Sequence, residues 1–432
     1  MDIALKKLPN GLPVILVDTH AFPSVSTLLL VGTGSRNETA KTNGISHFFE
    51  HMAFKGSDDY PTSFDISSKI EGLGGIFNAF TSKDHTGYYV KGTNVHFDEI
   101  SDVMSQMLLH PLLVPEEMER EKEVIVEEIN MYEDMPARRV SDLFDELIFK
   151  GHELARDVAG TPETVRSFTK KDVQDYLKTH YQPTNSVIVV AGGLSNGNKK
   201  FTNEKYYSQI EKNFGGWTGD YLKKENIFRL KQIRINLKVL TKKTEQAHFC
   251  LGYPAFSFSD PRRHALSVLS TILGGGMSSR LFIEVRERRG LCYYVSTGRE
   301  LYSDTGYIVT QAGVTNSAAK VNEAIKVIID EHEKIASGDL KEEELIKAKE
   351  LLKGRLLLSL EDSYRVAALQ GTRYVFENKT VDPLKIINNI ESVTMENVSS
   401  LARDLFKREL LNVALIGPVK RSEIKIFKSD YN

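Results

Sequence analysis

The sequence predicts an α+β protein in which one structural unit of about 210 residues occurs twice. The chain has 432 residues, which is enough for two domains of ordinary size. In each half, strand-like runs precede a helix and a hairpin, long helical segments follow, and an apolar strand comes last. We therefore expect a first half at 1–215, a linker at 216–232 and a second half at 233–432.

The first half begins and ends with strand-like segments. Residues 12–17 and 25–31 are rich in β-branched and apolar residues, which is typical of strands. A helix is expected to begin at Asn43 as its N-cap and to end at Lys55, before Gly56. The other expected elements are a helix at 66–73, a hairpin at 76–82 and 86–92, helices at 97–109, 116–132, 137–149 and 170–180, and a buried strand at 186–191.

The second half shows the same kinds of pattern in a similar order. The expected elements are strands at 234–240 and 248–253, helices at 261–273 and 279–287, strands at 292–298 and 307–312, helices at 317–336 and 341–360, and a strand at 411–416. This recurrence favours a duplicated unit over a solenoid of short repeats.

The composition is that of a globular protein and points to no charged partner. Hydrophobic residues make up 41% of the chain, charged residues 26%, and the net charge is −2, so neither nucleic acid nor a membrane is expected as a partner. The two cysteines, Cys250 and Cys292, cannot supply a disulfide framework or a cysteine-based zinc site. No apolar run is long enough to span a bilayer, and the first residues lack a secretory signal. We expect a cytoplasmic protein.

The strongest chemical signal is the motif His47-Phe48-Phe49-Glu50-His51. On a helix, His47 and His51 project from one face about one turn apart, which suits two imidazole ligands of one zinc ion. Glu50 lies between them and can accept a proton from water that the metal has acidified. This is the inverted H-x-x-E-H pattern of zinc peptidases, and ~0.02 chance matches are expected in this composition. The alternative is a pair of surface histidines beside a carboxylate, but the flanking apolar residues favour a buried helix.

A catalytic zinc site needs a third protein ligand, and the helix at 116–132 offers several glutamates. Glu121 and Glu128 are seven residues apart and share a face with apolar residues, where a carboxylate is costly unless it is paired or bound to metal. We therefore expect Glu128 to be the ligand and Glu121 to support the site from behind it. Glu119, Glu123 and Glu127 are expected to form solvent-side pairs with Arg120 and Lys122. Glu127 also remains an alternative ligand.

With these residues in place, the chain resembles the pitrilysin-type (M16) metallopeptidases, close to the β-subunit of the mitochondrial processing peptidase and its bacterial relatives. The resemblance covers nearly the whole length. It is carried by residues 47–56, 78–82, 119–128, 273–281 and 286–293. The separation of His51 from Glu128 matches the family pattern, which favours Glu128 over Glu127.

The resemblance implies a clamshell of two homologous halves around a chamber, with one Zn²⁺ per chain. It implies that substrate binds as an added strand at Asn78 and Ala79, where an exposed edge pairs with any extended backbone. It also implies that Arg286 and Tyr293 reach the substrate carbonyl and stabilise the oxyanion. From the residues alone, we would interpret Asn78 and Ala79 as part of an ordinary hairpin strand. We would likewise interpret Arg286 as a surface residue.

The sequence therefore predicts a zinc-dependent endopeptidase that acts on peptides or unfolded polypeptides, with Glu50 as general base. A homodimer is expected, and a heterodimer with a homologous subunit is the alternative. The main rival function is a non-catalytic structural or partner subunit, such as the core proteins of the respiratory bc1 complex. A zinc hydrolase with a non-peptide substrate is a further alternative. The sequence leaves the preferred cleavage site open.

Overall fold

The computed structural model of the chain describes residues 1–195, 203–221, 227–228 and 232–426. These residues form two compact units, each built around its own sheet. The first unit takes in segments 1–129, 156–225 and 357–381, and the second takes in 130–155, 226–356 and 382–432. Residues 222–226 and 229–231 of the predicted linker lie outside the described residues, so the division at 216–232 stays a prediction.

The first unit contains a six-stranded sheet in the order β1-β2-β6-β3-β5-β4. The strands are β1 (Asp2–Lys7), β2 (Pro13–Asp18), β3 (Ser24–Val31), β4 (Ile76–Thr81), β5 (Thr86–Thr93) and β6 (Ser186–Gly192). The helices are α1 (Ile45–Met52), α2 (Ser63–Gly72), α3 (Phe97–Leu109), α4 (Pro115–Glu133), α6 (Pro162–Ser167), α7 (Lys170–His180), α8 (Asn203–Phe214) and α12 (Ser363–Glu377), and α4 continues past the end of the unit's first segment.

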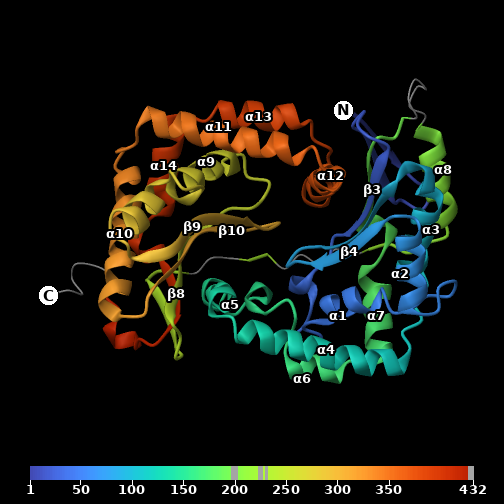
Figure 1. The fold of residues 1–432 in the computed structure, drawn as a ribbon, viewed down its shortest axis with the longest axis horizontal. Coiled ribbons are helices and arrows are strands. Elements are labelled where there is room, and N and C mark those ends of the chain that lie inside the picture. Colours follow the sequence, from blue (N-terminus) through green and yellow to red (C-terminus); the bar gives the residue numbers. More distant parts are fainter. Residues whose placement is uncertain (196–202, 222–226, 229–231, 427–432) are drawn as a thin grey trace. The chain divides into compact units, whose positions relative to one another are not determined.

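Helices cover both faces of this sheet (Figure 1). Helices α1, α3 and α8 pack on one face, and α12 packs on the other against β2, β3 and β6. Because both faces are covered, β2 and β6 are buried at every position and read as continuous apolar runs.

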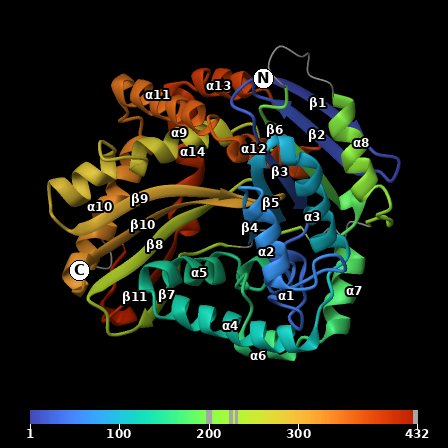
Figure 2. The ribbon, with the colours of Figure 1, turned by 45° about the vertical axis from the view of Figure 1, so that its right-hand side comes forward.

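The second unit contains a five-stranded sheet in the order β7-β11-β8-β10-β9. Figure 2 shows β8, β10 and β9 running side by side, with β9 at the free edge. The elements are α5 (Pro136–Ile148), β7 (Asn236–Thr241), β8 (Gln246–Ala255), α9 (Arg263–Gly274), the π-helical turn η5 (Phe282–Glu287), β9 (Cys292–Leu301), β10 (Gly306–Thr315), α10 (Ala318–Ala336), α11 (Glu342–Ser359, whose last turn belongs to the first unit), α13 (Pro383–Glu391), α14 (Met395–Leu405) and β11 (Asn412–Gly417).

The two sheets share one topology. In the first sheet, β2 pairs in parallel with β6, the last strand of the first half. In the second sheet, β7 pairs in the same way with β11, the last strand of the second half. Strand β6 then pairs antiparallel with β3, and β11 pairs antiparallel with β8. A hairpin completes each sheet, with β4 as the edge strand of β4–β5 and β9 as the edge strand of β9–β10. The prediction of an α+β protein with duplicated halves is therefore confirmed, with a repeat of about 220 residues instead of 210, because β3 begins at residue 24 and β8 at residue 246.

One helix of each half packs on the sheet of the other half. Helix α5 precedes β6 in the chain, yet it covers β11, β7 and β8 with an apolar face that includes Phe144. Helix α12 precedes β11, yet it belongs to the first sheet, where Val366 and Ala367 enter the core. Gly371 of α12 allows the close approach, because a Cβ there would meet Leu30 Cδ1 at 2.4 Å. This exchange explains why both compact units are discontinuous in sequence.

Candidate metal centre

Helix α1 carries the predicted motif and packs against β4, β5 and α7. Phe48 and Phe49 are fully buried, which directs the opposite face of the helix to the site. The prediction that Asn43 caps this helix is wrong. The N-cap is Gly44, whose φ is 95°, and a Cβ at this position would lie 2.6 Å from the carbonyl oxygen of Ala159. The backbone can reach this conformation cheaply only with glycine.

The structure brings the side chains of His47, His51 and Glu128 together. One ligand atom from each residue lies within 4.8 Å of the others. His47 Nε2 is 3.7 Å and His51 Nε2 is 3.6 Å from Glu128 Oε2. Four-coordinate zinc with bonds of 2.0–2.1 Å places its ligand atoms about 3.3 Å apart, so two nitrogens and one carboxylate oxygen at these distances fit that ion.

Burial of His47 and a hydrogen-bond partner of His51 both suit metal binding. Burial lowers the pKa of His47 to about 4, with the neighbouring His51 acting in the same direction, so its ring is neutral at pH 7. His51 Nδ1 lies 2.8 Å from Glu121 Oε1, which leaves Nε2 directed to the site. A carboxylate on the far nitrogen of a ligating histidine fixes its tautomer and orientation.

Glu121 is buried but charged. Burial opposes its ionisation, but contacts to His51 and Lys55 outweigh this effect and lower the pKa of the carboxyl. Lys55 Nζ lies 2.5 Å from Glu121 Oε2. The sequence predicts Glu121 as a residue that supports the ligand Glu128, and in the structure its carboxylate contacts His51 and Lys55. Its supporting role stays a prediction.

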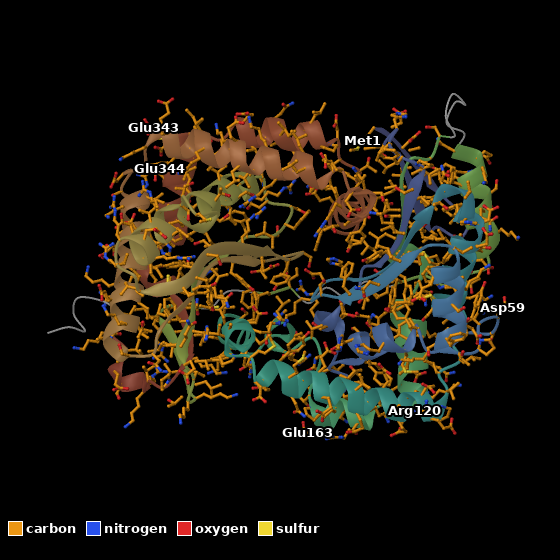
Figure 3. All side chains as sticks on the ribbon, viewed as in Figure 1. Met1, Asp59, Arg120, Glu163, Glu343 and Glu344 are labelled. Carbon is orange, nitrogen blue, oxygen red and sulfur yellow. The ribbon has the colours of Figure 1, made fainter. Side chains whose placement is uncertain are left out.

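Several other charged residues of α4 are exposed, although Lys122 is buried. Glu127 is exposed, whereas Glu128 is only partly exposed and faces the histidines. Figure 3 shows Arg120 of α4 and Glu163 of α6 at the outer rim of the unit. The expected pairing of Glu119 with Lys122 is present at 2.6 Å. Two partners differ from expectation, because Glu123 pairs with Arg166 at 2.9 Å and Arg120 pairs with Glu117.

Glu50 extends from α1 toward the end of β4. Its Oε2 accepts a hydrogen bond of 2.6 Å from the hydroxyl of Thr81. Burial raises the pKa of Glu50, and the hydrogen bond from Thr81 opposes part of that rise. A carboxylate with a raised pKa beside the candidate metal ligands is suited to taking up and returning a proton.

Asn78 and Ala79 lie on β4, which is the edge strand of the first sheet. Ser82 N donates to His85 O over 2.9 Å and closes the hairpin. In the alternating antiparallel pattern, this bond makes Phe80 and Asn78 the residues bonded to β5 and leaves the backbone of Ala79 pointing outward. The outward N–H of Ala79 donates to Asn78 Oδ1 over 2.8 Å.

Arg286 and Tyr293 lie in the second unit, at the end of η5 and the start of β9. The guanidinium of Arg286 lies 4.7 Å from the ring centroid of Phe282 and 5.5 Å from that of Tyr293. Tyr293 is 73% exposed. These two residues contact each other, and their approach to a substrate stays a prediction.

Sequence reasoning did not assign roles to Thr81, Lys55 or Glu38. Thr81 could have been found, because it is two residues past Ala79 and so shares its face of β4. Lys55 is four residues after His51, and on the predicted helix that spacing would let both reach one carboxylate. The prediction that this helix ends at Lys55 is wrong, because α1 ends at Met52. Glu38 carries no such local signal, because it contacts α1 from a preceding loop.

Two family models match the chain. One is described as insulinase (peptidase family M16) and matches residues 13–162, and the other is described as peptidase M16 inactive domain and matches residues 167–352. Together with the duplicated fold and the His–His–Glu group, these matches identify the class. The chain belongs to the M16 peptidase family.

Curated relatives of similar length support this assignment. The uncharacterized zinc protease YmxG of Bacillus subtilis is 36% identical over 95% of this chain and 97% of its own. An uncharacterized zinc protease of Streptomyces coelicolor is 34% identical over 96% of this chain and 89% of its own. A protease from Helicobacter pylori shares the fold, with a TM-score of 0.87 at 24% identity over 96% of this chain and 100% of that structure.

These findings confirm the predicted family and its zinc cofactor, since the relatives are named zinc proteases and the chain has a matching donor group. They support a metallopeptidase that acts on peptides. Among the described residues, no helix combines the length and the apolar character needed to cross a membrane. The predicted compartment and the predicted homodimer stay predictions.

Proposed function

We propose that the chain is a zinc-dependent endopeptidase that cleaves peptides or unfolded polypeptides bound as an added strand along β4. One observation carries the proposal. Glu50 interacts electrostatically with His51 and Glu128 of the donor group, and its carboxylate accepts a hydrogen bond from Thr81 of β4. Glu50 therefore connects the candidate metal ligands to the edge strand β4.

His47 Nε2, His51 Nε2 and a Glu128 oxygen would hold the ion. When bound, zinc supplies a Lewis acid that polarises a carbonyl and lowers the pKa of water. Glu50 accepts the proton of the attacking water and returns it to the leaving amine. Thr81 holds the Glu50 carboxylate in one orientation through its hydroxyl. Glu121 and Lys55 keep the His51 ring in place during the reaction.

The edge of β4 would position the substrate. An extended peptide that adds to this edge pairs with the outward backbone of Ala79 and its neighbours, which gives affinity with little dependence on side chains. In the free chain, the Ala79 N–H is occupied by Asn78 Oδ1. Substrate pairing therefore requires the Asn78 side chain to release this N–H, after which its amide is free to contact the peptide.

Arg286 and Tyr293 would stabilise the negative charge that develops on the substrate carbonyl oxygen. This role comes from the family resemblance and from their mutual contact. Replacement of either residue by Ala or Phe is expected to lower kcat/KM without loss of zinc. An unchanged kcat/KM would remove them from the mechanism.

The decisive experiment compares the wild type with Glu50→Gln on a mixed peptide library, with bound zinc measured in parallel. We expect both proteins to bind one zinc per chain and only the wild type to cleave. Normal turnover by the variant would exclude Glu50 as base. A wild type that binds zinc but cleaves no peptide, alone or with a homologous chain, would favour the non-catalytic alternative. Light scattering of the same samples tests the predicted homodimer.

A further inference from the structure

Helix α1 has no N-cap side chain of its own. Its cap residue is Gly44, and no side chain at that position satisfies the first N–H groups of the helix. The helix has eight residues, and helices this short are unstable without tertiary contacts at their ends. Since His47 is in the first turn and His51 in the second, any movement of the N-terminus changes the direction of both rings.

A buried carboxylate from outside the helix takes the place of the cap. Glu38 follows the short turn at Ser35–Asn37 and is 3% exposed. Its Oε2 accepts hydrogen bonds from Gly44 N at 2.7 Å and from Asn43 Nδ2 at 3.0 Å. Its Oε1 accepts from Ser46 N at 2.9 Å and from Ser46 Oγ at 2.6 Å. A negative charge at this end of a helix also interacts favourably with the helix dipole.

The backbone of Glu38 and two of the residues that donate to its carboxylate bond other segments in turn. Arg156 Nη1 donates to the carbonyl oxygen of Glu38 over 2.7 Å. The hydroxyls of Ser46 and Tyr176 lie 2.7 Å apart, which links the same group to α7. Asn43 Nδ2 also donates to the carbonyl oxygen of Asp157 over 2.8 Å. Glu38 and Asn43 thus connect the N-terminus of α1 to the segment 156–157, and Ser46 connects it to α7.

We propose that Glu38 is a positioning residue of the metal centre, which sets the direction of the His47 and His51 rings by binding the N-terminus of α1. The proposal rests on the proposed function in one respect, namely that these histidines bind zinc. Glu38 itself contacts neither zinc nor substrate. Loss of its carboxylate should weaken metal binding as the loss of other supporting hydrogen bonds does, by about 10-fold to 100-fold.

The test is Glu38→Gln, which keeps the size of the side chain and removes the charge and two acceptor positions. Zinc affinity is measured by competition with a chromophoric chelator, and the visible spectrum of the Co²⁺-substituted protein reports the ligand geometry. We expect an affinity at least about tenfold weaker and an altered Co²⁺ spectrum. The matched control is Ser317→Ala, which removes the N-cap hydrogen bond of α10 in the other unit.

A merely structural role predicts a different result. In that case both variants would lower the unfolding temperature, and both would keep the zinc affinity and the Co²⁺ spectrum of the wild type. That outcome overturns the proposal. If Glu38→Gln does not fold, Ser46→Ala takes its place, because it removes only the 2.6 Å bond to Glu38 and the contact to Tyr176. A weaker affinity with a changed spectrum supports the proposal, and unchanged values contradict it.

Different results would contradict the proposed function and the positioning role of Glu38. A wild-type protein that binds no zinc, or whose zinc binding survives His47→Ala, contradicts the proposed function. A wild type that binds zinc through His47 while Glu38→Gln binds it equally well contradicts only the positioning role.

Discussion

The hydroxyl of Thr81 donates a hydrogen bond to Oε2 of Glu50 over 2.6 Å. Thr81 is the last residue of the edge strand β4. Glu50 lies on α1, immediately before His51. This single bond joins the proposed base to the strand that would hold the peptide. If peptide binds along β4 as proposed, this bond would couple the position of the base to the position of the substrate backbone.

Thr81→Val keeps the shape of the side chain and removes this donor. A hydrogen bond to a charged group contributes about 1.5–3 kcal/mol, so we expect kcat to fall at least about tenfold while bound zinc is unchanged. The control is Thr27→Val in β3, whose buried hydroxyl has no hydrogen-bond partner. Steady-state kinetics on one peptide substrate compare the three proteins, and a kcat of Thr81→Val within twofold of the wild type would contradict the coupling.

Glu128→Gln and Glu127→Gln distinguish the candidate third ligand from its exposed neighbour. Glu128 faces the histidines and Glu127 does not, so we expect only Glu128→Gln to lose stoichiometric zinc. The loss follows because a neutral amide is a poor ligand for zinc compared with a carboxylate. Metal analysis after dialysis against a weak chelator measures the difference. Zinc retained by Glu128→Gln and lost by Glu127→Gln would reverse the assignment.

Ala79→Pro removes the outward N–H of β4 without removing a hydrogen bond to β5. Because a substrate strand would use this N–H, and because the proline ring would hinder its approach, we expect kcat/KM to fall at least about tenfold. Zinc content should be unchanged. Ala79→Gly keeps the N–H and should retain most of the activity. Equal kcat/KM values for the two variants would mean that peptide does not pair at this position.

His332 of α10 makes the second unit sensitive to acid. Its ring stacks on Phe406 with centroids 4.3 Å apart, both ring nitrogens lack hydrogen-bond partners, and burial lowers its pKa to about 3. The unfolded chain takes up this proton near pH 6.5 and the folded chain does not, so stability falls as pH drops below 6.5. Between pH 7.5 and 5.5, metal-free wild type should lose about 1.4 kcal/mol more unfolding free energy than His332→Phe. Urea unfolding at the two pH values measures this, and parallel losses in both proteins would exclude His332 as the cause.

The sequence predicts most of the strands and the long helices, because their apolar residues recur at the spacing of the buried face. It does not predict α12, where the buried face contains Gln370 and Gly371 instead of large apolar residues. Gln370 is fully buried because its side chain bonds the N–H and the carbonyl oxygen of Val381 at 2.9 and 2.7 Å. A helix whose partner is a sheet hundreds of residues away leaves no local signal of what it covers.

In the candidate site, too, the sequence predicts some residues and misses others. His47, Glu50, His51 and Glu128 follow from helix geometry, because the required side chains recur on one face. The cap was predicted wrongly at Asn43, since an asparagine before a helix is the usual local signal. The true partner, Glu38, reaches the helix through a loop whose path depends on Arg156 and on the segment near Asp157. Such contacts depend on tertiary structure and cannot be predicted from spacing.

The exchange of α5 and α12 has a consequence for synthesis on the ribosome. The last strand of the first sheet ends at residue 192, but α12, which covers one face of that sheet, begins only at residue 363. During the translation of about 170 residues, the side chains of Ile15, Leu28 and Val189 on that face have no covering helix from their own chain. A nascent chain in this interval exposes an apolar sheet surface, the kind of surface that chaperones bind and that promotes aggregation. Truncation before residue 363 is therefore expected to yield an insoluble first half, even though the H-x-x-E-H motif and the candidate third ligand, Glu128, have already been made.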